Sequence, residues 1–378
     1  MYRIFYAERD ASLYERFPDK NTGIDQILEL TKNQSGSIVD GRYRANTFNT
    51  RILIDFGSEI DVLTSDINTG KIPAIGNSAK SASVYLSLKS SDATDLLQKY
   101  NLEAFPISQS WTNGQGYSND TPKTTIGTSW HYRDTSNGTY WDTTNSPSSG
   151  RLGLTETSNG GGAWSTGSTY EASQSFYNQV PDLRMNVTDI VDNWVKGNTT
   201  NYGFMVKRPY IDETSGESLG SIKFFGRESH TIFVPRLEVV WDNTVFTNTS
   251  SAEIATDSYV PYFKNIKSEY RTSEIAKFRI GVRPEFPAKT YITTSFYLTG
   301  ERLPTSSFYS IIDSVTNEPI IEYDTLGTKI DCDVNGSFFK LRMDSFMPER
   351  YYKIQLKIER DAGEDIQTYD DFYFKVVN

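Results

Sequence analysis

Short segments in which apolar and polar residues alternate, separated by clusters of turn-forming residues, constrain the fold of this chain more than any other feature. The alternation is clear over residues 83–88, 278–282 and 354–358. Side chains of a β-strand point alternately to its two faces, so this pattern indicates strands with one buried face. Gly, Ser, Thr and Asn fill the intervals, as turns between strands require. The pattern predicts the all-β fold class.

Helical periodicity points to two short segments. The stronger runs from Val187 to Val195, where apolar residues recur at i, i+3, i+4, i+7 and i+8 and form one stripe. Asn186 is suited to cap its start and Gly197 to end it. A weaker helical pattern covers Asp92–Tyr100.

The stretch from Trp111 to Tyr170 is dense in Gly, Ser, Thr and Asn, yet it holds four tryptophans. One interpretation is a loop layer that its tryptophans pin onto a β-sandwich. The other is an aromatic platform on which sugar rings stack, formed by Trp111, Trp130, Trp141 and Trp164. Stacking needs an open ring face, so burial of these rings would decide between the two.

The length of 378 residues is typical of two or three domains. All six tryptophans precede a polar stretch near Asn243–Asp257, and none follows it. We therefore predict one domain over residues 1–243, a linker over 244–257 and a second domain over 258–378.

The second domain has the strand content of an immunoglobulin-like sandwich, with about seven strand-like runs in about 120 residues. Residues 291–298 form one of these runs. Asn335-Gly336 separates two others and is the best hairpin turn in the chain.

Charge and hydropathy exclude several classes of protein. The net charge is −10, which argues against a surface that coats nucleic acid. The longest apolar run is Ile4–Ala7, far short of the roughly 20 residues of a membrane span, and the N-terminus has no signal-peptide core. The single cysteine, Cys332, forms no internal disulfide, which favours folding in a reducing cytoplasm.

Catalytic and metal-binding motifs are scarce. The chain has two histidines and no Gly-rich phosphate loop, zinc-protease motif or paired-cysteine motif. We expect no enzyme activity and no cofactor, and we rank hydrolase or lyase activity on polysaccharide last. Asp10, Asp55 and Asp189 offer oxygen ligands for a structural calcium ion, but each has a simpler place at a strand or in the first turn of a helix.

The first 243 residues resemble the DNRLRE-type domains, which are related to carbohydrate-binding modules. The similarity begins at Asp10–Tyr14 and Asn21–Gly23 and continues through Arg51–Phe56, Ser81–Leu86 and Ser110–Thr112. Its most specific part is an ordered series near the end: Leu183–Val191, Trp194–Gly197, Asn201–Phe204, Phe225–Glu228 and Pro235–Val239.

Details of these motifs are similar to virion structural proteins of tailed bacteriophages, at Val180–Met185, Phe224–Thr231 and Glu238–Asp242. The C-terminal part resembles their immunoglobulin- or fibronectin-like domains, at Phe338–Leu341 and Met347–Tyr352. The resemblance implies a jelly-roll-like β-sandwich with a long Trp-bearing insertion and one short helix. An immunoglobulin-like β-sandwich would follow it.

The same resemblance sets the functional expectation. It implies a non-enzymatic component of the virion neck or collar, tail or fibre, assembled in the host cytoplasm and acting through protein–protein contacts. The expected partners are other virion proteins and copies of the same chain in a symmetric oligomer, without nucleic acid or membrane. The alternative is a carbohydrate-binding module that contacts host surface polysaccharide.

Overall fold

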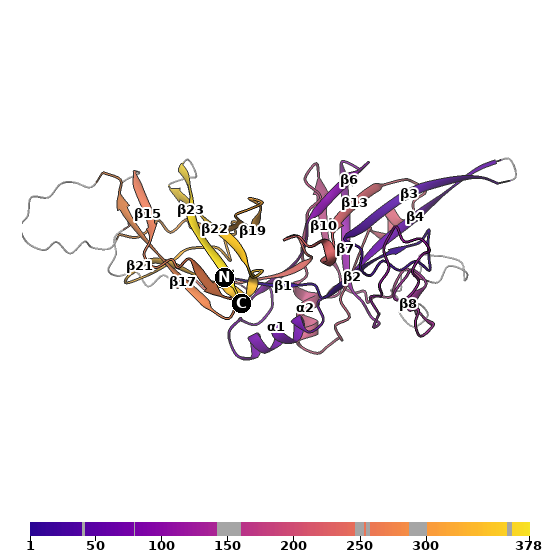
Figure 1. Ribbon diagram of the computed structural model, residues 1–378, viewed down its shortest axis with the longest axis horizontal. Helices are drawn as coiled ribbons and strands as arrows, with labels where there is room; N and C mark the ends of the chain where they lie inside the picture. The colour runs from indigo at the N-terminus through magenta and orange to yellow at the C-terminus, as the bar shows by residue number, and fades with distance from the viewer. Residues whose placement is uncertain are drawn as a thin grey trace, which may run out of the picture. The chain divides into compact units, whose positions relative to one another are not determined.

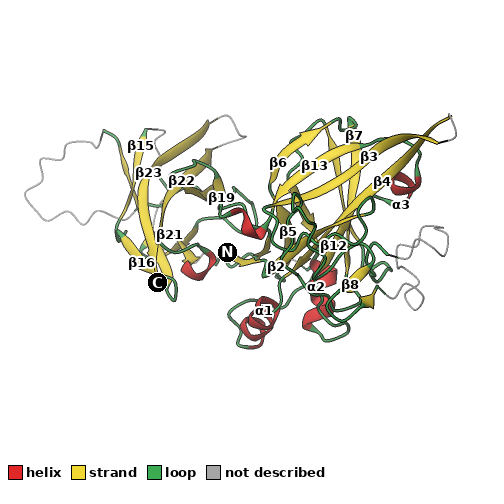
Figure 2. Cartoon of the chain, turned by 45° about the vertical axis from the view of Figure 1, so that its right-hand side comes forward, coloured by secondary structure: helices red, strands yellow, loops and turns green. Residues whose placement is uncertain are grey.

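The computed structural model describes residues 1–39, 42–78, 80–141, 160–245, 253–254, 258–286, 301–360 and 365–378. Strands dominate these residues and helices are few (Figures 1 and 2), which confirms the predicted all-β class. The chain divides into two compact units. The larger comprises Phe5–Ser78 and Ala82–Glu238, and the smaller comprises Met1–Ile4, Ala79–Ser81 and Val239–Asn378. The predicted strand over 291–298 and most of the predicted linker lie outside the described residues.

Two main sheets contain most strands of the larger unit. The first has the order β1-β14-β5-β11, with β1 (Tyr2–Tyr6), β14 (Arg236–Val240), β5 (Ser83–Leu88) and β11 (Leu183–Asn186). Two strands of this first sheet, β1 and β14, continue into residues assigned to the smaller unit. The second has the order β10-β7-β12-β4-β3-β13-β6, and β2 also pairs with β4. Its strands are β2 (Arg9–Tyr14), β3 (Ile27–Val39), β4 (Arg42–Asp55), β6 (Ser90–Thr94), β7 (Lys99–Pro106), β10 (Ala172–Tyr177), β12 (Phe204–Lys207) and β13 (Gly220–Phe225). A small pair, β8 (Tyr132–Asp134) and β9 (Thr139–Tyr140), lies in the predicted insertion.

The β3–β4 hairpin positions the surface described below. Its strands run side by side well beyond neighbouring strands (Figure 1), with the register Lys32↔Asn49 to Val39↔Arg42. From Thr50 onward β4 pairs instead with β2, beginning at Tyr14↔Thr50. Three strands therefore meet at the base of the hairpin.

The helix predicted over Val187–Val195 is confirmed as α2 (Thr188–Val195). Val187, Ile190, Val191 and Trp194 of its apolar stripe are buried. The Asn186 side chain accepts hydrogen bonds from the backbone N–H and hydroxyl of Thr188. Gly197, with φ +71°, ends the helix by donating its N–H to the Trp194 carbonyl.

The helix predicted over Asp92–Tyr100 is wrong. The segment forms the end of β6, a turn at Asp95 with φ +55°, and the start of β7. β6 pairs with β13, and this pairing outweighs a weak helical preference.

The sequence analysis also did not anticipate α1 (Glu59–Asn68), which buries Ile60 and Leu63 and lies beside α2 (Figure 2). A further short helix, α3 (Tyr210–Thr214), follows β12. None of the helices in the described ranges has the length and apolar character needed to cross a membrane.

The smaller unit also contains two main sheets. One has the order β15-β17-β21-β20, with β15 (Tyr259–Phe263), β17 (Ile275–Pro284), β20 (Asp331–Asp333) and β21 (Gly336–Arg342). The other has the order β16-β23-β22-β18-β19, with β16 (Glu269–Arg271), β18 (Ser307–Asp313), β19 (Pro319–Ile321), β22 (Arg350–Arg360) and β23 (Asp365–Val377).

Aromatic rings join these two sheets face to face. The ring centroids of Tyr309 on β18 and Phe339 on β21 are 4.1 Å apart, and those of Phe278 on β17 and Phe374 on β23 are 5.6 Å apart. A hairpin is present here, but its turn lies one residue earlier than the predicted Asn335-Gly336, because Asp333 pairs with Gly336 and leaves Val334 and Asn335 as the connection.

Candidate functional site

The four tryptophans predicted to stack on sugars are buried. Their exposed fractions are 3% for Trp111, 2% for Trp130, 2% for Trp141 and 4% for Trp164. They pack in one cluster against β2, β4 and β12 residues, including Leu13, Leu53 and Met205. A sugar needs an open ring face, so the structure corrects the prediction of a sugar platform at these rings. The packing agrees with the other interpretation, in which the tryptophans pin a loop layer onto the sheet.

Polar contacts fix the same layer. The indole N–H of Trp111 donates to the Tyr202 carbonyl and that of Trp141 to the Ser129 carbonyl, both at 2.9 Å. The Arg51 guanidinium carbon lies 4.8 Å from the Trp130 ring and 5.0 Å from the Trp164 ring. These distances are those of cation–π contacts.

Arg51 belongs to a buried charge cluster that the sequence analysis missed. Its Nε and Nη2 each donate to a different oxygen of the Glu213 carboxylate at 2.9 Å, and both side chains are 1% exposed. The Nζ of Lys207 lies 3.4 Å from Glu213. Burial alone would raise the pKa of Glu213, but the two cations outweigh burial and lower it.

The cluster holds the loop layer and α3 on the sheet. The Nη1 of Arg51 donates to the Gly161 carbonyl at 2.7 Å. The buried Nζ of Lys32 donates to the carbonyls of Asp212 and Glu213, at 2.5 and 2.7 Å, where α3 ends. These charged groups are therefore engaged with partners inside the protein.

The three aspartates considered as calcium ligands lie in separate settings. Asp10 is buried and accepts the backbone N–H of Arg227 at 2.6 Å. Asp55 pairs with Arg9, and Asp189 accepts the side-chain amide of Asn77. In the part of the chain that the structure describes, no cluster of His, Cys, Asp or Glu is arranged to hold a metal ion.

A pocket of about 170 Å³ lies at the base of the β3–β4 hairpin, where β2, β3 and β4 meet. Three aromatic rings contribute to its lining: Tyr14, Phe17 and Phe48. The polar lining includes Arg16, Glu29, Asn33, Gln34 and Asn49. Its volume is below the roughly 300–1,000 Å³ of pockets for drug-sized ligands, so it suits one small cyclic group.

Hydrogen bonds hold the pocket wall in place. The Tyr14 hydroxyl donates to Glu29 at 2.9 Å. Burial, and then the negative charge of Glu29, raise the pKa of Tyr14 well above its ordinary value, so the hydroxyl keeps its proton. The Asn49 amide donates to Glu15 at 3.0 Å and to the Glu213 carbonyl at 3.3 Å. Asn49 therefore connects the pocket wall to Glu213 of the buried charge cluster.

No protein-family model, curated protein or solved structure matches this chain. Aromatic rings with amide and carboxylate groups offer an apolar face together with hydrogen-bond donors and acceptors.

The sequence analysis missed the pocket because its residues come from separate segments. The sequence offered one local signal: Phe48 interrupts a polar run in β4. The exposure of Phe17, at 37%, is evident only in the structure. In the sequence, Phe17 and Phe48 are both far from Trp111–Tyr170, the stretch in which the sugar site was predicted.

Proposed function

We propose that this chain is a non-enzymatic structural component of a tailed-bacteriophage virion that acts through protein–protein contacts. In this proposal the larger unit is jelly-roll-like and the smaller unit is immunoglobulin-like. The observation that carries it is the strand order of the smaller unit, because the resemblance to virion proteins implies an immunoglobulin-like domain there.

That strand order supports the immunoglobulin-like fold. The strands taken as A, B, E and D correspond to β15, β17, β21 and β20, in one sheet. The strands taken as A′, G, F, C and C′ correspond to β16, β23, β22, β18 and β19, in the other. Tyr352, near the start of β22, donates its hydroxyl to the Met347 carbonyl at 2.8 Å, as in the tyrosine corner of such domains.

The larger unit supports the jelly-roll-like proposal less directly. β5 and β6 are consecutive in the chain but belong to different sheets, which is typical of a two-sheet sandwich. The buried tryptophan layer and α2 close over parts of this unit, as the implied insertion and short helix would.

The experiment for the virion role is to locate the chain in intact particles. Mass spectrometry of separated heads and tails is expected to find it in the tail fraction, at a copy number that follows the rotational symmetry of the particle. Absence from purified particles would overturn the proposal.

A second function, glycan binding, is favoured by the pocket at the hairpin base. The rings of Tyr14 and Phe48 offer apolar surface to a sugar, and the side chains of Glu29, Asn33 and Gln34 offer groups for hydroxyls. This function and the structural role are compatible, because a particle protein can also contact a surface glycan.

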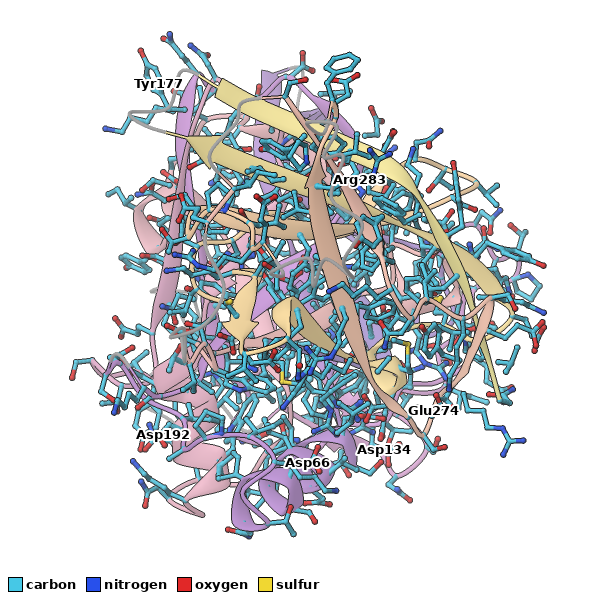
Figure 3. The ribbon with its side chains drawn as sticks, turned by 90° about the vertical axis from the view of Figure 1, so that its left-hand side faces the viewer. Asp66, Asp134, Tyr177, Asp192, Glu274 and Arg283 are labelled. Carbon is cyan, nitrogen blue, oxygen red and sulfur yellow. The ribbon has the colours of Figure 1, made fainter. Side chains whose placement is uncertain are left out.

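Glycan arrays and titration calorimetry test the second function. Phe48→Ala and Asn33→Ala are expected to weaken binding, because they remove an aromatic face and an amide from the pocket. Asn33 is exposed, so its variant is expected to keep the fold. The control is Tyr177→Ala, which changes an aromatic at 64% exposure outside the pocket (Figure 3). Equal binding by all three variants, or no binding by the wild type, would contradict a glycan site here.

A further inference from the structure

Three cationic side chains surround Phe17, one of the aromatic residues of the pocket. The Nζ of Lys123 lies 3.7 Å from the ring centroid, the guanidinium carbon of Arg16 5.5 Å and the Nζ of Lys20 5.6 Å. Arg16 also lines the pocket. This concentration of positive charge occurs on a chain whose net charge is −10.

These cations have no carboxylate partner at ion-pair distance among the described residues. Lys20 donates to the Ser118 carbonyl, while Arg16 and Lys123 are exposed side chains. Two other lysines of the same unit do have such partners: Lys89 lies 3.0 Å from Asp182 and Lys71 lies 3.1 Å from Asp66.

The neighbouring acidic groups are already held by protein donors. Asp25 accepts the backbone N–H of Ser118, Asp120 accepts that of Tyr117, and Glu29 accepts the Tyr14 hydroxyl. Their charges partly offset the cations.

Repulsion between the cations remains. Burial, and then the positive charge of Lys123, lower the pKa of Lys20, although Asp25 and Glu29 oppose this shift. A bound anion would reduce the repulsion.

We propose that the pocket binds an anionic sugar, a pyranose ring that carries a carboxylate, with Arg16 and Lys123 facing the carboxylate. This inference rests on the glycan-binding function proposed above. The planar guanidinium of Arg16 matches a carboxylate through two parallel hydrogen bonds, and Lys123 adds a second, exposed positive charge. Tyr14 and Phe48 would contact the ring, and Asn33 and Gln34 its hydroxyls.

The test compares trigalacturonate with its methyl ester, which keeps the sugar skeleton and removes the charge. At low salt, the wild type is expected to bind the acid at least about tenfold more tightly than the ester. The double variant Arg16→Gln/Lys123→Gln is expected to bring that ratio close to one while it binds the ester as the wild type does. Raising the salt concentration is expected to reduce the wild-type ratio, because these side chains are exposed.

A matched control removes two exposed cations from the smaller unit, with Lys264→Gln/Arg283→Gln (Arg283 is labelled in Figure 3). It is expected to keep the wild-type ratio. A ratio that falls equally in both double variants would overturn the assignment, since it would reflect net charge alone.

Other outcomes of the same experiment distinguish a failure of the anionic preference from a failure of glycan binding, the function on which it rests. If acid and ester bind equally and Phe48→Ala abolishes both, the anionic preference is wrong while glycan binding stands. If neither saccharide binds, glycan binding fails with it. If a sulfated galactan binds more tightly than trigalacturonate, the proposal that the anionic group is a carboxylate is wrong. If polyglutamate binds as tightly as trigalacturonate, the proposal that the ligand is a sugar is wrong.

Discussion

Replacing Glu213 by Gln is expected to destabilise the larger unit strongly. The carboxylate is 1% exposed and neutralises two buried cations, Arg51 at 2.9 Å and Lys207 at 3.4 Å. The amide keeps the shape but removes the charge, so both cations are left without their main partner. Breaking a buried pair in this way typically costs about 3–5 kcal/mol, a large part of the roughly 5–15 kcal/mol that stabilises a domain.

Urea unfolding followed by tryptophan fluorescence measures this loss. Of the six tryptophans, only Trp241 lies in the range of the smaller unit, so the signal reports mainly on the larger one. The control is Asp192→Asn (Asp192 is labelled in Figure 3), which breaks a pair with Lys196 on the surface of α2. Exposed helical pairs of this kind contribute about 0.3–0.5 kcal/mol.

The pH dependence gives a second readout of the same charge. The pKa of Glu213 is lower in the folded protein than its ordinary value. Its stabilising contribution is therefore present above the unfolded pKa of about 4.3 and is lost as the pH falls through the folded pKa. Wild type and Glu213→Gln are expected to differ most above about pH 4.3 and to converge below it. If Glu213→Gln costs no more than Asp192→Asn near neutral pH, the argument from buried charge is refuted.

Three further changes probe other parts of the structure. Burial raises the pKa of Asp10 to about 7, so the folded state keeps a proton that the unfolded chain releases near pH 3.9. The melting temperature of the wild type should therefore fall as the pH rises from about 3.9 to about 7. The melting temperature of Asp10→Asn should not show this decrease. An unchanged slope would contradict the assignment to Asp10. Gly161→Ala is expected to lose more than about 1 kcal/mol in urea unfolding, because its φ is +80° and a Cβ there would lie 2.3 Å from the Arg51 guanidinium; no loss would show that the loop yields. Tyr352→Phe should cost the smaller unit about 1 kcal/mol, measured by calorimetry, and a neutral result would show that its hydroxyl hydrogen bond is dispensable.

Local patterns predicted the elements whose stability depends on one buried face. The stripe of Val187–Val195 specified α2, and the alternation over residues 83–88 specified β5. The prediction failed at Asp92–Tyr100, where pairing of β6 with β13 fixed the conformation. α1 was missed although Ile60, Leu63 and Ile67 are spaced as on one helical face.

The candidate site could not be predicted in the same way. Tryptophan content marked the insertion as important, but it could not show whether the rings face solvent or the core. The answer depends on β2, β4 and β12, which supply the apolar surface that covers them. The pairing of Arg51 with Glu213 joins residues 162 positions apart, and no spacing rule connects them.

The sequence by itself determined the all-β class, the principal helix and the hairpin near Asn335, because short-range periodicity and turn chemistry specify each of them. Only the tertiary structure decided which aromatic rings are buried and which charges are paired. It also brought Tyr14, Phe17 and Phe48 together at the base of the β3–β4 hairpin. These features depend on strands that are distant in sequence and adjacent in space. Local sequence patterns do not specify them, because the residues that cover a ring or neutralise a charge come from other parts of the chain.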